Sequence, residues 1–242
     1  RIRQRAGPDV RVMAVVKANA YGHGIVPVSK ALEGEVDFFG IASLKEASLL
    51  REQGITTPLL VFGRIFPDEV PIALQKNLIL TVSSLEEAKI ISEEAQRLSK
   101  SASLHVKVDT GMGRLGVPYE RAFSEIVTMA SLPAIHLDGI YTHFPTAERF
   151  PDFFTETQLS NFEKLIQNLE ARGISLAYRH AANSAGALRF QSPFLNLIRP
   201  GIALYGIYPD PSFEQEITLE PALSLKSRIA LVVGGTSGIG RA

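Results

Sequence analysis

Short apolar runs alternate with longer, charge-rich amphipathic segments over the first two hundred residues, and this alternation constrains the fold most. Strands that alternate with helices build parallel βα units, which form either a closed (β/α)8 barrel or a doubly wound sheet. Eight strands within about two hundred residues favour the α/β class with a (β/α)8 TIM barrel. The predicted strands are Val12–Val16, Asp37–Ala42, Leu59–Phe62, Leu78–Val82, Ser103–Val108, Ile135–Thr142, Leu176–His180, and an eighth through Asn196–Arg199 and Ile202–Tyr205.

Six segments between these runs have the apolar spacing of helices. Ser84 stands before an acidic first turn, as a helix N-cap does. Gly173 follows Arg172 and is expected to end the last long helix. The predicted helices are Ile25–Leu32, Leu44–Gln53, Glu69–Gln75, Leu85–Leu98, Glu120–Ala130 and Thr157–Arg172.

The pattern changes after about Pro209. Residues 210–216 are polar and rich in turn formers, and Pro221–Val233 then alternates like the strands of another module. We therefore predict a barrel over residues 1–212. We expect residues 213–242 to be the truncated start of a C-terminal β-rich domain, followed by an atypical glycine-rich tail.

Composition excludes several kinds of function. The 242 residues carry 25 basic and 25 acidic side chains, which argues against a nucleic-acid-binding surface. The absence of cysteine excludes disulfides, thiolate metal sites and a cysteine nucleophile. The five histidines show no ligand spacing beside carboxylates, so no metal is expected. Because no membrane helix or signal peptide is visible, we expect a cytoplasmic enzyme without membrane partners. The chain begins with arginine, so its natural N-terminus is expected to be missing.

Polar residues follow the apolar runs at five predicted strand ends. Active sites of (β/α)8 barrels lie at the C-terminal ends of the strands, where such residues would converge. Five strand ends that carry this chemistry together predict one site. Its candidates are Lys17, Asp109, Arg114, His143, Asn183, Ser184, Arg199, Gly201 and Ile202.

Lys17 ends a run that predicts a strand buried on both faces. By position alone, a lysine that merely reaches out of the strand end is an equal alternative. A lysine at a barrel mouth can also form a Schiff base with an aldehyde cofactor, provided that nearby cations such as Arg114 and Arg199 lower its pKa. The segments after the last two strands are the usual phosphate site of such barrels, and Ser184 and Gly201 suit it. Together these features predict pyridoxal phosphate binding.

Five segments, in order, resemble the alanine racemase family over roughly residues 10 to 230. They are AVVKANAYGHG (14–24), KVDTGMGRLG (107–116), YTHF (141–144), HAANS (180–184) and RPGIALYG (199–206). The resemblance implies a pyridoxal-phosphate barrel that interconverts L-alanine and D-alanine for peptidoglycan and acts as a homodimer.

Roles follow from the resemblance position by position. Lys17 would hold the cofactor and move the α-proton on one face, and Arg114 would lie near the cofactor's phenolic oxygen and the substrate carboxylate. Lys107 corresponds to a lysine that is carbamylated in some members, and His180 would support Arg199. The resemblance also implies that Arg199 faces the pyridine nitrogen and that His143 lies against the cofactor ring. The implied phosphate contacts are Tyr21, Ser184 and the backbone of Gly201 and Ile202. Asn183 either binds the cofactor or shapes the turn.

The resemblance also breaks in two places. The family's second acid–base group is a tyrosine from the partner's C-terminal domain, and none of the six tyrosines here matches it. The final stretch, ALVVGGTSGIGRA (230–242), resembles the first strand and glycine turn of short-chain dehydrogenases. A non-catalytic pyridoxal-phosphate homeostasis barrel and a dehydrogenase fusion therefore stay open as alternatives. The choice between alanine and serine also stays open.

Overall fold

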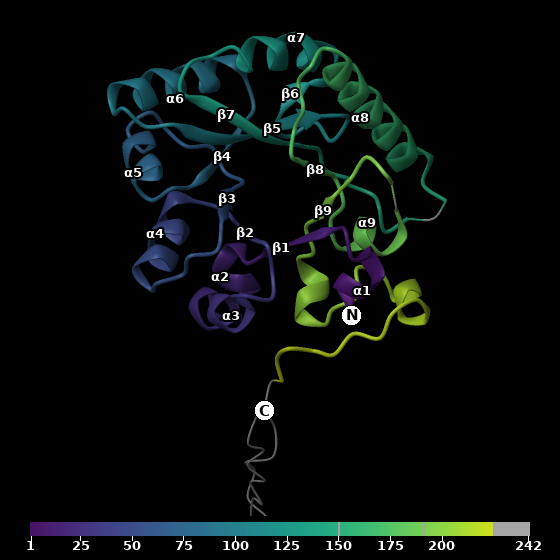
Figure 1. Ribbon diagram of the computed structural model, residues 1–242. Helices are drawn as coiled ribbons and strands as arrows, with labels where there is room; N and C mark the ends of the chain where they lie inside the picture. Colours follow the sequence, from purple (N-terminus) through teal and green to yellow (C-terminus); the bar gives the residue numbers. More distant parts are fainter. Residues whose placement is uncertain (150, 191, 225–242) are drawn as a thin grey trace, which may run out of the picture.

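The computed structural model describes residues 1–149, 151–190 and 192–224, and these form a barrel of parallel strands inside a layer of helices (Figure 1). The strands follow the spatial order β8-β7-β5-β4-β3-β2-β1-β9. Their bounds are β1 Arg11–Val15, β2 Phe38–Ile41, β3 Leu59–Val61, β4 Ile79–Val82, β5 Ala102–Asp109, β7 Ile135–Tyr141, β8 Tyr178–His180 and β9 Leu197–Ile198. The short β6 (Val117–Pro118) pairs only with the end of β5.

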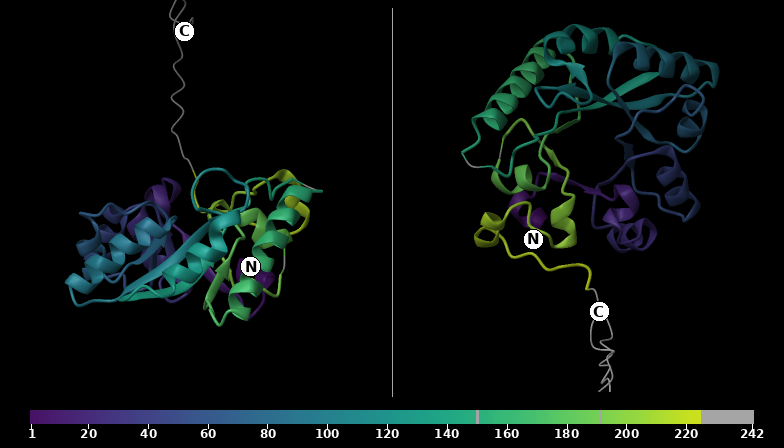
Figure 2. Two further views of the ribbon diagram at one scale, coloured as in Figure 1. Left: turned by 90° about the horizontal axis from the view of Figure 1, so that it is seen from above. Right: turned by 180° about the vertical axis from the view of Figure 1, so that it is seen from behind.

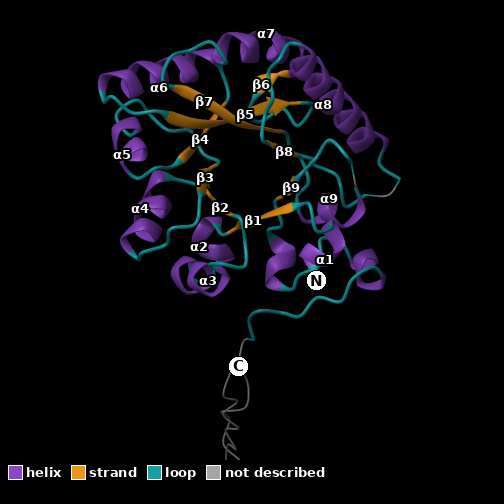
Figure 3. Cartoon of the chain, viewed as in Figure 1, coloured by secondary structure: helices purple, strands orange, loops and turns teal. Residues whose placement is uncertain are grey.

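Helices cover the outside of this ring, as the colouring in Figure 3 and the view from behind in Figure 2 show. None of the described helices is long and apolar enough to cross a membrane. The helices are α1 Ile2–Ala6, α2 Lys17–Tyr21, α3 Ile25–Leu32, α4 Leu44–Glu52, α5 Val70–Gln75, α6 Leu85–Arg97, α7 Tyr119–Met129, α8 Phe153–Ala171 and α9 Ser184–Arg189, with the 3-10 helices η1 Ile202–Tyr205 and η2 Pro211–Gln215.

The ring closes between β8 and β9 through one asparagine and one arginine. Asn196 donates its backbone N–H to the carbonyl of Arg179 (3.1 Å) and accepts the Arg179 N–H on its side-chain oxygen (2.9 Å). Further along, the Arg199 N–H donates to the Ala182 carbonyl at 2.9 Å. On its other side β9 pairs in parallel with β1. These bonds bring the ends of β1, β8 and β9 to one rim of the barrel.

Burial on both faces explains why the strands read as continuous apolar runs. In β1, Met13 packs inside the barrel with Phe38 and Leu60, whereas Ala14 faces the helical layer with Phe39. All five of these residues are less than 4 % exposed. A parallel strand covered on both sides has no polar face, so alternation disappears from its sequence.

The structure confirms the predicted barrel, its six helices and their end signals. Ser84 accepts a hydrogen bond from the Glu87 N–H at 3.2 Å and so caps α6. Gly173, with φ of +81°, follows α8 in the left-handed conformation that glycine adopts without strain. Helix bounds differ from the predicted ones by four residues at most, at the start of α8.

One predicted strand segment is wrong. Ile202–Tyr205 is the 3-10 helix η1, and the eighth strand contains only Leu197–Ile198. Pro200 has no N–H to continue the ladder, and the Leu204 N–H turns back to the Gly201 carbonyl at 2.9 Å. The apolar pattern did not predict the short elements α1, α2, α9, η2 and β6. Within the predicted strand region, residues 221–224 contain no strand, and residues 225–242, including the glycine-rich tail, lie outside the described part.

Candidate active site

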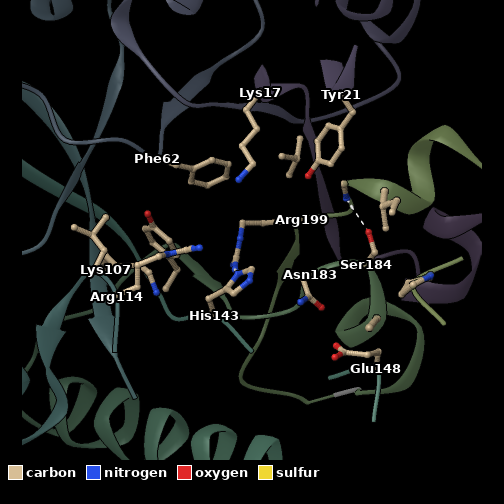
Figure 4. Close-up of a pocket in the computed structure, with 17 residues that line it drawn as sticks. Lys17, Tyr21, Phe62, Lys107, Arg114, His143, Glu148, Asn183, Ser184 and Arg199 are labelled. Carbon is tan, nitrogen blue, oxygen red and sulfur yellow. Dashed lines mark hydrogen bonds between the residues drawn. The ribbon is translucent and has the colours of Figure 1, made fainter. Parts of the chain in front are cut away.

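A cavity of about 310 Å³ opens at the C-terminal ends of the strands, and it contains every residue that the sequence predicted as cofactor-binding or catalytic (Figure 4). The predicted residues in its wall are Lys17, Tyr21, Arg114, His143, Asn183, Ser184, Arg199, Gly201 and Ile202. Their roles stay predictions, but their convergence is a structural fact. Residues from five strand ends meet here because parallel strands deliver their carboxyl ends to one rim.

Lys17 stands at the start of α2, which is a single left-handed turn. Ala18, Asn19, Ala20 and Tyr21 have φ between 54° and 55°, a conformation that costs an L-residue roughly 1–2 kcal/mol. The turn carries Lys17 and Tyr21 into the cavity side by side (Figure 4). Strain of this kind persists only where surrounding contacts hold it, and it is typical of functional sites.

Asn19 and Glu46 hold the strained turn. The Asn19 side-chain oxygen accepts the Ile25 N–H at 2.9 Å, while its own N–H donates to Glu46 Oε1 at 3.3 Å. The other carboxylate oxygen of Glu46 accepts the Ala42 N–H at 2.7 Å. One carboxylate at the start of α4 therefore ties the turn to the end of β2. Sequence reasoning missed Glu46, since its spacing from Ser43 is also that of an ordinary capping box.

The pKa of Lys17 lies below its ordinary value. Burial is the main cause, followed by the positive charges of Arg114 and Arg199, while the Glu46 carboxylate opposes the shift. In a partly desolvated cavity, nearby cations disfavour the ammonium form of lysine and a nearby anion favours it. A larger share of Lys17 is therefore the neutral, nucleophilic amine than for a lysine in water.

A group of donors for a phosphate lies at the other end of the cavity. Ser184 begins α9, and its hydroxyl oxygen accepts the backbone N–H groups of Gly201 (2.9 Å) and Ala203 (3.2 Å), the first of them drawn in Figure 4. The Tyr21 hydroxyl points to the same place. A methyl group built on Gly201 would lie only 2.5 Å from the Tyr21 oxygen. Only glycine lets the backbone come this close to the hydroxyl.

Arg199 occupies the centre of the site and is only 5 % exposed. Its guanidinium donates to the carbonyls of Thr142 (2.8 Å) and Ala181 (3.0 Å) and to Nδ1 of His180 (2.9 Å). Burial lowers the pKa of Arg199 to about 10, so the group still carries its charge at neutral pH. A fixed cation therefore faces the cavity.

Three neighbouring groups have strongly shifted pKa values, with burial as the leading cause. The pKa of Lys107 falls to about 7, with Arg199 as a second cause. The pKa of His143 falls to about 3, again helped by Arg199, so this imidazole is neutral. The pKa of Tyr141 rises to about 12, and its ring lies 5.2 Å from both the Lys107 ammonium and the Arg199 guanidinium. The cavity thus holds a concentration of positive charge suited to anionic ligands.

The structure adds residues to the wall that the sequence did not mark, among them Phe62 and Glu148. Both follow strand ends, which is the one signal that could have drawn attention to them. Asp109 uses its carboxylate to accept the N–H groups of Gly111 (2.9 Å) and Gly113 (2.9 Å), so it shapes the loop before Arg114. In the described residues no group of three or more His, Asp or Glu side chains could hold a metal ion.

These residues fit pyridoxal phosphate. The cofactor needs a partly neutral lysine for its aldehyde, donors for its phosphate and a partner for its ring nitrogen. Lys17 offers the first, and Arg199 offers a permanent cation between the two ends of the cavity. The hydroxyls of Ser184 and Tyr21 offer donors for the phosphate, and Gly201 leaves a space beside them that a single Cβ would fill.

Comparison with known proteins agrees with this fit. The family model described as the N-terminal domain of alanine racemase matches residues 1–209. The alanine racemase of Desulforamulus reducens is 43% identical over 240 residues, which cover 98% of this chain and 65% of that protein. The alanine racemase of Methanococcus maripaludis is 44% identical over 228 residues, which cover 93% of this chain and 61% of that protein.

Solved structures show the same likeness. An alanine racemase of Clostridium difficile 630 in complex with cycloserine superposes with a TM-score of 0.88 at 37% identity, covering 91% of this chain and 61% of that one. The enzyme of Bacillus anthracis with bound L-Ala-P gives a TM-score of 0.81 at 36% identity, covering 91% and 58%. The chain thus spans about three fifths of the length of these relatives. Its family model, its relatives and its site agree, and the chain belongs to the alanine racemase family.

Proposed function

We propose that this chain is the cofactor-binding barrel of a pyridoxal-phosphate-dependent racemase that interconverts L-alanine and D-alanine. Pyridoxal phosphate is the cofactor of the family to which the chain belongs. The observation that carries the proposal is that Lys17, with its lowered pKa, lines one cavity together with Arg199 and the hydroxyl of Ser184. The bound cofactor would supply an electron-withdrawing ring that acidifies the α-proton of an attached amino acid.

The side chains would then divide the work. Lys17 Nζ, when neutral, would accept the α-proton on one face of the substrate and return it. Arg114, on the side of the cavity opposite Ser184, would bind the substrate carboxylate, which a planar guanidinium can hold with two hydrogen bonds. His143 stays neutral and would pack against the cofactor ring without adding charge.

Arg199 would control the outcome of the reaction. Because it keeps its proton, the pyridine nitrogen opposite it would stay unprotonated, and the ring would be a weaker electron sink than one facing an aspartate. With Arg199 in this place, negative charge at Cα would therefore last a shorter time. Rapid return of the proton at Cα suits racemisation and disfavours transamination.

Racemisation needs an acid–base group on each face of Cα. We propose that the second group is a tyrosine from the C-terminal part of the family, supplied by the partner subunit of a homodimer. Residues 1–242 span about three fifths of the relatives' length, and the tyrosine would belong to the remainder. The division into a barrel (1–212) and the start of a second domain (213–242), alanine as the substrate and the cytoplasm as the compartment stay predictions within this proposal.

Chemical trapping tests the proposal. Incubation with pyridoxal phosphate followed by borohydride reduction should attach the cofactor irreversibly to Lys17, identified by peptide mass spectrometry. Alanine in D₂O should then exchange its α-proton on the intact, unreduced protein, and Lys17→Ala should abolish both signals. Arg121→Ala, on the exposed face of α7, is the matched control and should change neither.

The outcomes separate the alternatives. Label on Lys17 with exchange or racemisation supports the racemase. Label on Lys17 without any exchange at Cα supports the non-catalytic cofactor-binding barrel instead. Label distributed over surface lysines, with none on Lys17, contradicts both.

A further inference from the structure

A second histidine lies behind Arg199 in the barrel interior, outside the cavity wall. His105, on β5, is 0 % exposed, and its Nδ1 lies 2.9 Å from Nε2 of His180. Its ring also stacks on Tyr178, with centroids 5.6 Å apart. Through His180, His105 is connected to the guanidinium of Arg199, which lies 2.9 Å from the other nitrogen of His180. The sequence analysis placed His105 inside the predicted strand Ser103–Val108 and assigned it no role.

The barrel wall is modified locally to admit this ring. Leu104 pairs with Leu137, but His105 pairs with Gly139, so the register between β5 and β7 shifts by one residue at this point. A Cβ built on Gly139 would lie 2.7 Å from two atoms of the His105 ring. No real Cβ tolerates such a contact, so a bulge and a glycine together make the space. Two independent backbone features therefore serve one buried histidine.

Hydrogen-bond chemistry sets the donor and acceptor at each contact from Arg199 through His180 to His105. Arginine has only donors, so Nδ1 of His180 must accept from Arg199. His180 then carries its proton on Nε2 and donates it to Nδ1 of His105. His105 in turn must carry its proton on Nε2. Any other arrangement would set two donors or two acceptors against each other at 2.9 Å.

We propose that His105 is a positioning residue for Arg199: it accepts from His180 and thereby fixes the ring that holds the guanidinium toward the cofactor's ring nitrogen. This inference rests on the proposed function only in that last step. The direction of the chain follows from the side chains alone. Aligned hydrogen bonds in a buried network polarise one another, so His180 becomes a better acceptor for Arg199 when His105 is present.

Two further observations support the proposal. Burial, with the charge of Arg199 as the second cause, lowers the pKa of His105 to about 3 and that of His180 well below its ordinary value, so both rings are neutral. In the part of the chain that the structure describes, Nε2 of His105 is buried without a hydrogen-bond partner. A leucine would pack here without an unpaired donor, so packing alone does not account for a histidine.

The test uses two substitutions that differ in one acceptor. His105→Leu removes the acceptor, and His105→Asn keeps an oxygen near the position of Nδ1. Nitrogen-15 NMR of the cofactor-free protein reports the protonated nitrogen of each histidine, and titration of the cofactor's absorption reports its affinity. His136→Leu, on the exposed part of β7, is the control for removal of a histidine.

We expect both buried rings of the unsubstituted protein to carry their proton on Nε2. His105→Leu should change the His180 signals and weaken pyridoxal phosphate about tenfold, the equivalent of one hydrogen bond, and His105→Asn should restore most of both. A proton on Nδ1 of His180, or unchanged His180 signals and affinity in His105→Leu, would overturn the proposal. Should His105→Leu not fold, the unsubstituted protein and His105→Asn still decide it. If the NMR result holds but neither the unsubstituted protein nor any variant binds the cofactor at Lys17, the proposed function fails, while the direction of the hydrogen bonds from Arg199 to His105 stands.

Discussion

Gly201→Ala tests the phosphate end of the site with the smallest possible change. The backbone of Gly201 has φ of −114° and ψ of −90°, so alanine would avoid the left-handed region but would lie outside the ordinary α and β ranges of ψ. Its methyl group would lie 2.5 Å from the Tyr21 hydroxyl oxygen, whereas ordinary contact begins at 3.4 Å. The hydroxyl must therefore retreat by about 0.9 Å. This displacement is enough to break a hydrogen bond to a phosphate in the place that we propose.

The expected loss follows from the value of that bond. A hydrogen bond to a charged group contributes about 1.5–3 kcal/mol, so pyridoxal phosphate should bind roughly 10- to 150-fold more weakly. Spectrophotometric titration measures this affinity. Thermal unfolding without cofactor measures the separate backbone cost of alanine at this position, while Tyr21, which is 41% exposed, can swing outward.

A double-mutant cycle supplies the control. Tyr21→Phe removes the hydroxyl that the new methyl group would meet, so Gly201→Ala should cost much less affinity in the Phe background than in the Tyr background. Equal losses in the two backgrounds would show that the methyl group does not act through the Tyr21 hydroxyl, and an unchanged affinity in the single variant would show that this hydroxyl does not hold the phosphate.

Three other predictions follow from the same site. Arg114→Leu removes a cation that lowers the pKa of Lys17, so the pH midpoint of cofactor attachment should rise. Glu46→Gln removes an anion that raises the pKa of Lys17, so the midpoint should fall. Shifts of the midpoint in the same direction in both variants would contradict these assignments. Lys107 is protonated in the folded and the unfolded chain below pH 7, and only in the unfolded chain between pH 7 and 10.5. Lys107→Met should therefore raise the free energy of unfolding of the cofactor-free protein at pH 6, and this increase should disappear towards pH 10.5. Denaturant titrations in CO₂-free buffer measure it. An increase that does not depend on pH would show that Lys107 is not a buried charge at pH 6. Ala18→Gly relieves one exposed left-handed residue and should raise the free energy of unfolding by about 0.5–1 kcal/mol; a lower melting temperature would contradict the strain.

Much of the fold could be predicted because its elements are encoded locally. The apolar run of β1 and the capping of α6 by Ser84 depend on residues close together in the chain, and each agrees with the structure. The wrong strand prediction at Ile202–Tyr205 also has a local cause. That stretch has strand-like composition, but Pro200 and Gly201 interrupt the ladder and a tighter helix forms.

The predicted site residues converge because barrel topology sends every strand end to one rim, so position along the chain predicted most of them, and the family resemblance added Tyr21. Contacts across the barrel were beyond that reasoning. Glu46 holds Asn19 from 27 residues away, and His105 meets His180 from 75 residues away across a bulge at Gly139. Residue order along the chain was thus enough to predict most of the polar side chains that line the cavity, although it missed Glu148 and the apolar Phe62. The roles of Glu46 and His105 became visible only in the folded structure, because hydrogen bonds between distant residues depend on distances that folding creates.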